Sequence, residues 1–479
     1  MAINFLNKGT GTIKPNIFIQ NNEPTVKNGI WIKSNNFAYS NITEVEDESS
    51  LVANSINIIK GATYETIVLN SNIVNGLHYK FNSVIITDEN NDIDYTKNIY
   101  YGNDTSWIDI TPAQGHIYGI KRLRNSSSSA WQRTDEGVGL IANATHDGTA
   151  VQNDFDNLSP WKDIISFNYD HSQNLVTAYY GDDDFSFVPE NTKVNVFTKI
   201  PQFWYKRWID EDDYEHIQIA DYAASGFLES KEFAAGRYPF QGSTSTPRSI
   251  SGLAPLTNTS GEDYKTATLS MGNNFCLLDW KALGAIQFLY LVEYADYNSQ
   301  DKLGYGICGY ELGENGKTNS GQLDNLGMKS GCLNNDKFHS VSYRGIEDIF
   351  GHVFQLIDGV NINNSQAYVC DDYTKYEFEK YDEDYEQIGY VNASSEGFIS
   401  KMGLDENYPL LMLPIGSDGN NENDYITDYY VLGTGNQAFR YGGNYVYNLK
   451  AGFFCVACNM NASHVAIPLG TRLLLRQNG

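Results

Sequence analysis

Four ionisable side chains lie within twelve residues of one another in the segment SYRGIEDIFGHVFQLIDG: Glu347, Asp348, His352 and Asp358. Carboxylates and an imidazole in one place can hold a metal ion or exchange protons with a substrate. Their spacing, however, matches neither HExxH nor another compact ligand set. The last eight residues alternate like a strand, and Gly351 suits a tight turn before it. The pattern therefore favours a core strand flanked by turn residues over a catalytic or metal site.

Cys455 and Cys458 have the CxxC spacing of zinc and redox sites. No second pair lies nearby in the sequence, and two side chains three positions apart on a strand face opposite sides. The six cysteines of the chain are too few and too scattered for a disulfide framework. We therefore predict that they are buried small apolar residues, with no metal and no cofactor.

Clusters of acidic residues could supply several oxygen ligands to Ca²⁺. None has the spacing of an EF-hand loop, so solvated loops are the favoured interpretation and a calcium ion in one of them is the alternative. The clusters are Asp88–Asn98, Gly181–Phe185, Asp210–Glu215, Tyr381–Glu386 and Gly416–Tyr425. The nucleophile elbow, the P-loop and the dinucleotide fingerprint are absent from the sequence. A pair of carboxylates distant in sequence, as in glycoside hydrolases, stays open.

The composition indicates β-rich globular domains. The chain has 479 residues, enough for more than one domain, and its 34 Tyr and 23 Phe greatly outnumber its 6 Met. With 59 acidic and 33 basic residues, the net charge is −26, which repels nucleic acid and anionic membranes. There is no apolar run of about 18 residues and no secretory signal in the first twenty, so we expect synthesis in the cytoplasm and no membrane insertion.

The chain divides by pattern into three parts. Residues 1–112 contain short apolar or alternating runs separated by turn residues, which predicts a β-rich module. A middle β-rich region, 113–200, leads into a third part, 201–479, with an insertion near 361–430 that carries an extra hairpin. Residues 277–298 predict one long helix, because apolar residues recur at intervals of three and four. The expected fold class is mainly β, or α+β with one long helix.

The C-terminal segment has the composition of a recognition surface. After Gly442 and Gly443 it is rich in Tyr and Asn. Tyr offers a large contact area with few rotatable bonds, and Asn offers adaptable hydrogen bonding. The alternative is a Tyr-rich pair of strands packed in the core.

These motifs together resemble a known family. The segment YRGIEDIFGHVFQLIDGVNI, the later GG and AGF, and the closing GTRL resemble C-type-lectin-like domains of the formylglycine-generating-enzyme type, as carried by bacteriophage fibre and receptor-binding proteins. The matching residues are Gly345, Ile346, Glu347, Gly351, Val353, Phe354, Gln355, Asp358, Gly359, Gly442, Gly443, Gly452, Phe453, Gly470, Arg472 and Leu473. The resemblance covers most of 113–479. The segment KPNIFIQNNEPTVKNGIWIKSN is similar to tail proteins of phages of clostridial hosts.

The resemblance implies binding and not catalysis. The enzymatic branch of the family oxidises a cysteine with a pair of active-site cysteines, and Cys455 and Cys458 differ from that pair in spacing. The binding branch presents its C-terminal segment to a ligand. Carried over to this chain, the receptor-contact candidates are Tyr445, Tyr447, Asn448, Lys450, Phe454, Ala457 and Asn459. The glycines, Arg472 and the pair Phe354 and Leu356 are expected to be scaffold.

The resemblance also implies a role and a location. It predicts a receptor-binding protein of a phage tail or a phage-tail-like bacteriocin, located in the virion tail, made in the host cytoplasm and released by lysis. Residues 1–112 would attach it to the particle and 201–479 would bind the host. The expected partners are a host surface protein or glycan and other tail or baseplate proteins, and the expected assembly is a homotrimer. The alternatives are a tail enzyme that degrades surface polysaccharide and a structural head or tail decoration protein.

Overall fold

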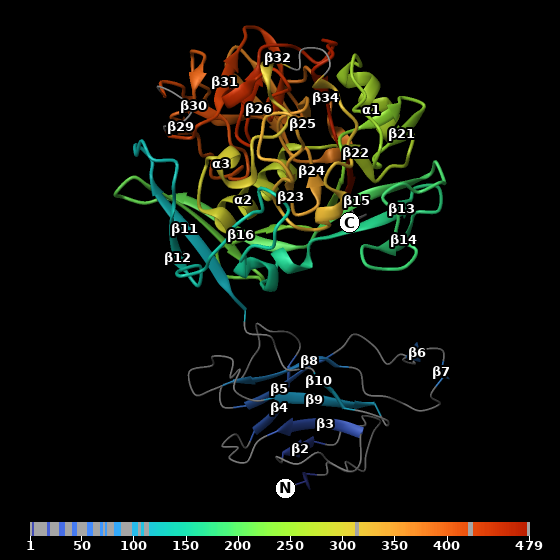
Figure 1. The fold of residues 1–479 in the computed structure, drawn as a ribbon. Coiled ribbons are helices and arrows are strands. Elements are labelled where there is room, and N and C mark those ends of the chain that lie inside the picture. Colours follow the sequence, from blue (N-terminus) through green and yellow to red (C-terminus); the bar gives the residue numbers. More distant parts are fainter. Residues whose placement is uncertain are drawn as a thin grey trace. The chain divides into compact units, whose positions relative to one another are not determined.

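The chain forms two compact units, Met1–Gly115 and His116–Gly479. The computed structural model describes residues 115–311, 316–419 and 425–476 in full, and within 1–114 it describes the strands (Figure 1). The division lies three residues beyond the end of the predicted N-terminal module. The described part of the chain is mostly β-sheet with few helices, as the sequence predicts.

The strands that the structure describes in the N-terminal unit are short and form three sheets. The first has the order β1 (Ala2–Ile3), β2 (Ile17–Ile19), β3 (Asn28–Lys33), β9 (Asn98–Asn103) and β10 (Trp107–Asp109). The second joins β4 (Asn41–Val45), β5 (Ser55–Lys60) and β8 (Phe81–Thr87), and the third pairs β6 (Val68–Leu69) with β7 (Asn72–Ile73). Strands β2, β3, β5, β6 and β8 lie in the apolar or alternating runs of the sequence.

The C-terminal unit begins with a five-stranded antiparallel sheet. Its order is β12 (Gln132–Asp135), β11 (Ile117–Leu123), β17 (Tyr214–Ala220), β16 (Phe203–Ile209) and β18 (Leu228–Ser230). Along β16, Phe203, Tyr205 and Arg207 are buried while the residues between them are half-buried. This period of two gives the sheet one core face and one outer face.

A six-stranded sheet joins distant parts of the chain. Its order is β14 (Leu175–Tyr179), β13 (Ile165–Asp170), β15 (Val194–Ile200), β19 (Phe233–Gly236), β35 (Leu473–Arg476) and β22 (Phe275–Leu277). The last strand of the chain is therefore an interior strand of this sheet. Because β15 pairs with β19 of the 201–479 part, the predicted middle region and the 201–479 part form one unit.

A third sheet carries the C-terminal segment. Its order is β27 (Tyr385–Val391), β26 (Gln366–Cys370), β25 (Phe354–Asn363), β32 (Asn436–Tyr441), β33 (Val456–Cys458), β31 (Tyr429–Leu432) and β28 (Gly397–Phe398), and β34 (Leu469–Gly470) pairs with β25. The strands β26 and β27 form a hairpin at one edge. This hairpin lies in the stretch where the sequence predicts an insertion.

Three α-helices occur in the described residues: α1 (Gly261–Leu269), α2 (Trp280–Tyr294) and α3 (Ser299–Leu303). Helix α2 matches the predicted long helix. Asp279 caps it by accepting a 2.9 Å hydrogen bond from the backbone N–H of Ala282, and Ala295 ends it in the left-handed conformation. None of these helices has the length and apolar character needed to cross a bilayer.

Helix α2 is buried on all sides because it packs against β11, β17 and β25. This explains why its sequence is apolar on every face and not along one stripe. Gly284 passes close to the chain at Leu410, where an added Cβ would lie 2.1 Å from the carbonyl oxygen. A side chain at this position would push the helix out of its place in the core.

Short elements complete the unit. Three two-stranded sheets pair β20 (Gln241–Ser243) with β21 (Thr246–Arg248), β23 (Ser342–Tyr343) with β24 (Ile346–Glu347), and β29 (Lys401–Met402) with β30 (Pro414–Gly416). Single 3₁₀ turns occur at Asp154–Asn157, Trp161–Asp163, Asp324–Leu326, Tyr373–Lys375 and Asn448–Lys450.

A buried ion pair fixes α2 to the rest of the unit. Arg344 donates from Nε and Nη2 to the two carboxylate oxygens of Glu293, at 2.7 and 2.8 Å. Tyr343 Oη and Asn153 Nδ2 donate to the same carboxylate at 2.9 and 2.7 Å. The Glu293 side chain is fully buried, so these four hydrogen bonds replace its hydration.

We expect Glu293→Ala to lower the free energy of unfolding by about 3–5 kcal/mol, because it leaves a buried guanidinium without its main partner. Urea unfolding followed by circular dichroism measures this. Lys375→Ala is the control, since its pair with Asp384 is half-exposed and screened by solvent, and so should contribute little to stability. Equal losses in the two variants would contradict this account of α2.

Candidate functional site

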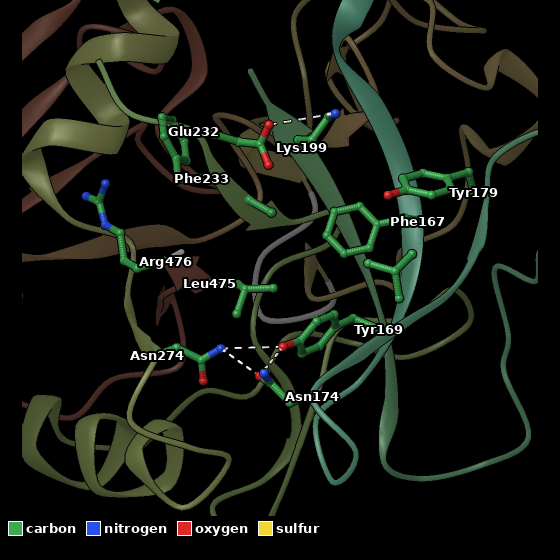
Figure 2. A pocket seen from close by; sticks show the side chains of 12 residues that line it. Phe167, Tyr169, Asn174, Tyr179, Lys199, Glu232, Phe233, Asn274, Leu475 and Arg476 are labelled. Carbon is green, nitrogen blue, oxygen red and sulfur yellow. Dashed lines mark hydrogen bonds and ion pairs between the residues drawn. The ribbon is translucent and has the colours of Figure 1, made fainter. Parts of the chain in front are cut away.

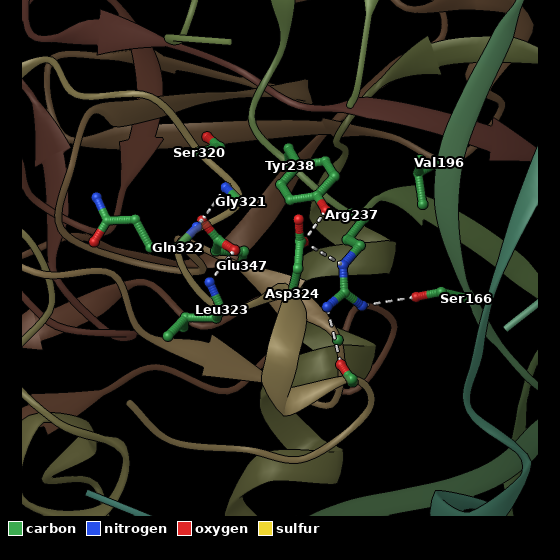
Figure 3. A network of polar contacts seen from close by, with 12 residues as sticks. Ser166, Val196, Arg237, Tyr238, Ser320, Gly321, Gln322, Leu323, Asp324 and Glu347 are labelled. Atoms are coloured by element: carbon green, nitrogen blue, oxygen red, sulfur yellow. Dashed lines mark hydrogen bonds and ion pairs between the residues drawn. The ribbon is translucent and has the colours of Figure 1, made fainter. Parts of the chain in front are cut away.

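The carboxylate of Glu347 holds a backbone turn (Figure 3). Its Oε1 accepts hydrogen bonds from the N–H groups of Gly321 and Gln322 at 2.7 and 3.2 Å, and its Oε2 accepts one from Leu323 at 3.1 Å. The side chain is fully buried. Burial and the neighbouring Asp348 raise the pKa of Glu347 to about 8. Both oxygens are occupied by the protein's own backbone.

Asp348 and His352 form a second buried contact. The imidazole Nδ1 lies 2.8 Å from Asp348 Oδ2, and Nε2 accepts a 3.2 Å hydrogen bond from the backbone N–H of Thr318. Since Nε2 is an acceptor, Nδ1 carries the proton and donates to Asp348 Oδ2. Asp358 lies apart from this pair, beside Gly359 N–H and 3.7 Å from Lys265 Nζ. The four ionisable residues of this segment thus bind the surrounding chain and do not converge on a common point.

The cysteines are buried and free, as predicted. Cys455 packs in a small cluster with Phe354 and Val431, whereas Cys458 packs in the main core, so the two face opposite sides of their strand. Burial raises the pKa of both thiols, that of Cys458 to about 12. A thiol held in this way is a weak nucleophile.

Turn hydrogen bonds stabilise two of the acidic clusters that the structure describes. Asp210 accepts from the N–H groups of Asp212 and Tyr214, and Asp182 accepts from that of Tyr179. The predicted cluster Asp88–Asn98 and part of Gly416–Tyr425 lie outside the described residues. Among the residues that are described, no three His, Cys, Asp or Glu side chains are grouped so as to hold a metal ion.

Backbone hydrogen bonds and close packing hold the C-terminal segment in place. Gly442 N–H donates to Cys455 O at 3.0 Å, and Asn448 N–H donates to Cys308 O at 2.7 Å. Asp428 lies under the segment and accepts a 2.7 Å hydrogen bond from Phe454 N–H. Gly452 has no room for a side chain, because an added Cβ would lie 2.1 Å from Asp428 Oδ1. These contacts fix the backbone that carries the predicted contact residues.

Three of the seven predicted contact residues are buried: Tyr445, Phe454 and Ala457. The Tyr445 ring lies against Gly316, and the Phe454 ring meets Tyr297 edge-on with centroids 4.9 Å apart. Ala457 lies in β33, between two neighbouring strands. The expectation that these three side chains are exposed is therefore wrong, because the segment turns them into the core.

The other four predicted residues are half-buried: Tyr447, Asn448, Lys450 and Asn459. Together with Tyr429 they form what we call the C-terminal face. The Tyr447 ring meets Phe354 edge-on at 4.7 Å, and Lys450 Nζ lies 4.2 Å above the Tyr429 ring. The role of these residues in receptor binding stays a prediction.

Two supporting residues were not predicted from the sequence: half-buried Tyr429 and buried Arg440. Tyr429 lies on β31 and supports Lys450 by a cation–π contact. Arg440 lies on β32, donates to Asn459 Oδ1 and stacks over Phe354 at 5.6 Å. The doublet Tyr429-Tyr430 gives a weak signal, because one of two consecutive strand residues must face outwards.

Comparisons with known proteins give few relatives. No family model matches the chain, and no curated protein matches it. Solved structures with partial similarity include three variants of the Major Tropism Determinant, U1, P3c and I1. Each is 9% identical, with TM-scores of 0.23, 0.24 and 0.24. The alignments cover 82%, 79% and 82% of this chain and 92%, 91% and 92% of theirs. At such TM-scores this similarity carries no argument, so the inferences below depend on the residues of this chain.

The burial of the Asp428 carboxyl group predicts that the stability of the folded unit depends on pH. Burial raises its pKa well above the usual range, and no charged group pairs with it among the described residues. The folded protein thus binds this proton more tightly than the unfolded chain, so stability from this group falls as the pH rises above about 3.9. Asp428→Asn keeps an acceptor for Phe454 N–H and removes the titration.

We expect the stability of Asp428→Asn relative to wild type to improve by up to about 1.4 kcal/mol per pH unit as the pH rises from about 4. Denaturant unfolding at a series of pH values measures this slope. Asp384→Asn, at an exposed position, is the control. A pH-independent difference for Asp428→Asn would show that the carboxylate is ionised in the folded protein.

Proposed function

We propose that this chain is a receptor-binding protein of a bacteriophage tail or a phage-tail-like bacteriocin. In this proposal the C-terminal unit attaches the particle to the host bacterium through the C-terminal face, and the N-terminal unit joins other tail or baseplate proteins. The proposal is supported by the resemblance of the sequence motifs to lectin-like receptor-binding domains and by the geometry of the C-terminal face.

The proposal depends mainly on one observation: within one short segment, some residues are fixed by buried contacts and others remain half-exposed. Gly442, Gly452 and Phe454 are fixed by buried contacts, while Tyr447 and Lys450 remain half-exposed beside them. A surface whose side chains are held before binding loses little conformational freedom on binding. Tyr and Asn then supply contact area and hydrogen bonds to a receptor.

We propose a binding role without catalysis. The buried carboxylates Glu347 and Asp428 accept hydrogen bonds from the backbone, which leaves them no path to a substrate. A recognition surface of two tyrosines, two amides and one lysine favours shape and hydrogen bonding over long-range steering. In a homotrimer, as the resemblance implies, three such faces would act together, so each contact can be weak.

The test is the binding of recombinant protein to intact cells of a panel of clostridial strains, comparing wild type with Tyr447→Ala/Lys450→Ala. Truncating two central contacts should cost about 2–4 kcal/mol, which lowers affinity roughly 30- to 900-fold. Tyr222→Ala is the matched control, because its ring is 41% exposed at a distant position in sequence on the same unit.

Thermal melting of each variant checks that the fold is intact. Undiminished binding by the double variant would place the receptor contact elsewhere on the chain. Absence of binding by the wild type, together with unimpaired adsorption of particles that lack the protein, would favour the decoration alternative.

A further inference from the structure

A hollow of about 310 Å³ opens on one face of the six-stranded sheet (Figure 2). It lies in a part of the unit that the C-terminal face does not use. Its floor and walls combine aromatic rings, aliphatic side chains and several polar groups.

The strand register explains the hollow. Lys199 pairs with Ala234 and Ala234 pairs with Leu475, so these three side chains stand in one row across β15, β19 and β35. The small Ala234 in the middle of this row leaves space that a larger residue would fill. In the neighbouring row, Phe167 on β13 pairs with Tyr179 on β14, with ring centroids 6.0 Å apart. The result is an aromatic wall beside an aliphatic floor.

Neutral hydrogen-bonding groups gather at one end. Asn274 Nδ2 lies 3.2 Å from Asn174 Oδ1 and 3.4 Å from Tyr169 Oη. Asn174 has a φ of 54° in the turn between β13 and β14, a conformation that Asn tolerates well. Within the described residues, Asn174 Nδ2 and Asn274 Oδ1 have no hydrogen-bond partner. One donor and one acceptor are therefore available to a ligand.

Charged groups stand at the other end. Lys199 Nζ lies 3.8 Å from Glu232 Oε2, and each side chain is about 30% exposed. Arg476 is held in place by an ion pair with Asp279 and by stacking over Phe233 at 5.4 Å. Figure 2 shows the Lys199–Glu232 pair and the asparagine cluster on opposite sides of Phe167 and Leu475. Polar groups thus face a ligand from both ends of an apolar floor.

A second hollow of about 840 Å³ continues the first, and the two share Glu232, Phe233 and Arg476. Tyr205, Trp280, Tyr373 and Tyr376 line it, together with charged residues at its rim. The two hollows adjoin at these shared residues, and we call them together the groove.

We propose that this groove binds a saccharide, with one sugar ring in the smaller hollow and further rings in the larger one. A sugar has apolar C–H faces that pack on aromatic rings and hydroxyl groups that both donate and accept hydrogen bonds. The aromatic wall and the paired amide and charged groups match this combination. Both acidic and basic side chains line the larger hollow, which disfavours a polyanion such as nucleic acid.

This saccharide site goes beyond the proposed function, because it does not depend on the C-terminal face. A receptor-binding protein with both sites could hold a surface glycan while the C-terminal face binds its receptor. Each site would then add to the avidity of attachment.

The test is saturation-transfer NMR of the full chain with glucose, galactose, rhamnose and N-acetylglucosamine, each at about 10 mM, a concentration suited to millimolar affinity. At least one of these sugars should receive saturation from the wild type. Tyr179→Ala/Lys199→Ala should weaken its binding at least tenfold. Both residues are partly exposed, so the fold should persist, and melting confirms it. Asn274→Ala serves as a second variant at the opposite end of the hollow.

Two controls separate this inference from the proposed function. Tyr222→Ala and Tyr447→Ala/Lys450→Ala should both keep sugar binding at the wild-type level. Loss of sugar binding in the second of these would move the saccharide to the C-terminal face and overturn the inference. Equal sugar binding by the wild type and both groove variants would also overturn the inference. The absence of saturation transfer from the wild type to any sugar would overturn it too. Cell adsorption is measured separately and tests only the proposed function.

Discussion

The guanidinium of Arg472 joins three parts of the chain that are distant in sequence. Nη1 donates to the carbonyl oxygens of Gly236 and Arg237, at 2.8 and 3.1 Å. Nη2 donates to those of Glu347 and Asp348, at 2.8 and 2.9 Å, and Nε donates to the Gln355 side chain at 3.1 Å. The side chain is fully buried, so these five acceptors replace its water. Burial lowers the pKa of Arg472, and the cation persists because every N–H finds an oxygen.

This one side chain brings together the elements that both surfaces need. It lies just before β35, whose strand pairs build the floor of the groove. It holds the segment 347–355 that leads into β25, and Phe354 on that strand supports Tyr447 of the C-terminal face. The two proposed recognition surfaces therefore rest on a common rigid core, which suits the proposed role of presenting fixed contacts to a cell surface.

The regular elements could be predicted from the sequence, because their signals are local. Helix α2 has its cap at Asp279 and an uninterrupted apolar pattern, and the strands follow apolar runs bounded by turn residues. The orientation of the C-terminal side chains could not be predicted in the same way. Tyr445 and Tyr447 are two apart and would share a face on a strand, but here they precede the 3₁₀ turn at Asn448–Lys450 and point in different directions.

No local pattern in the sequence indicates the groove. Its residues come from β13 to β15, β19 and the last strand, so only the strand register reveals that Ala234 leaves a space between Lys199 and Leu475. The structural role of the segment around Glu347 could be predicted from the sequence. Its turn glycines and spacing favoured a structural role, and the hydrogen bonds to Gly321 and Leu323 supply that role.

Hydrogen exchange of the chain bound to host cell envelopes tests the central claim most directly, since it maps the contact without any substitution. The account predicts that binding slows amide exchange in 445–451 and 429–432, on the C-terminal face. Slowed exchange confined to the N-terminal unit, or to the outer strands of the five-stranded sheet, would contradict it.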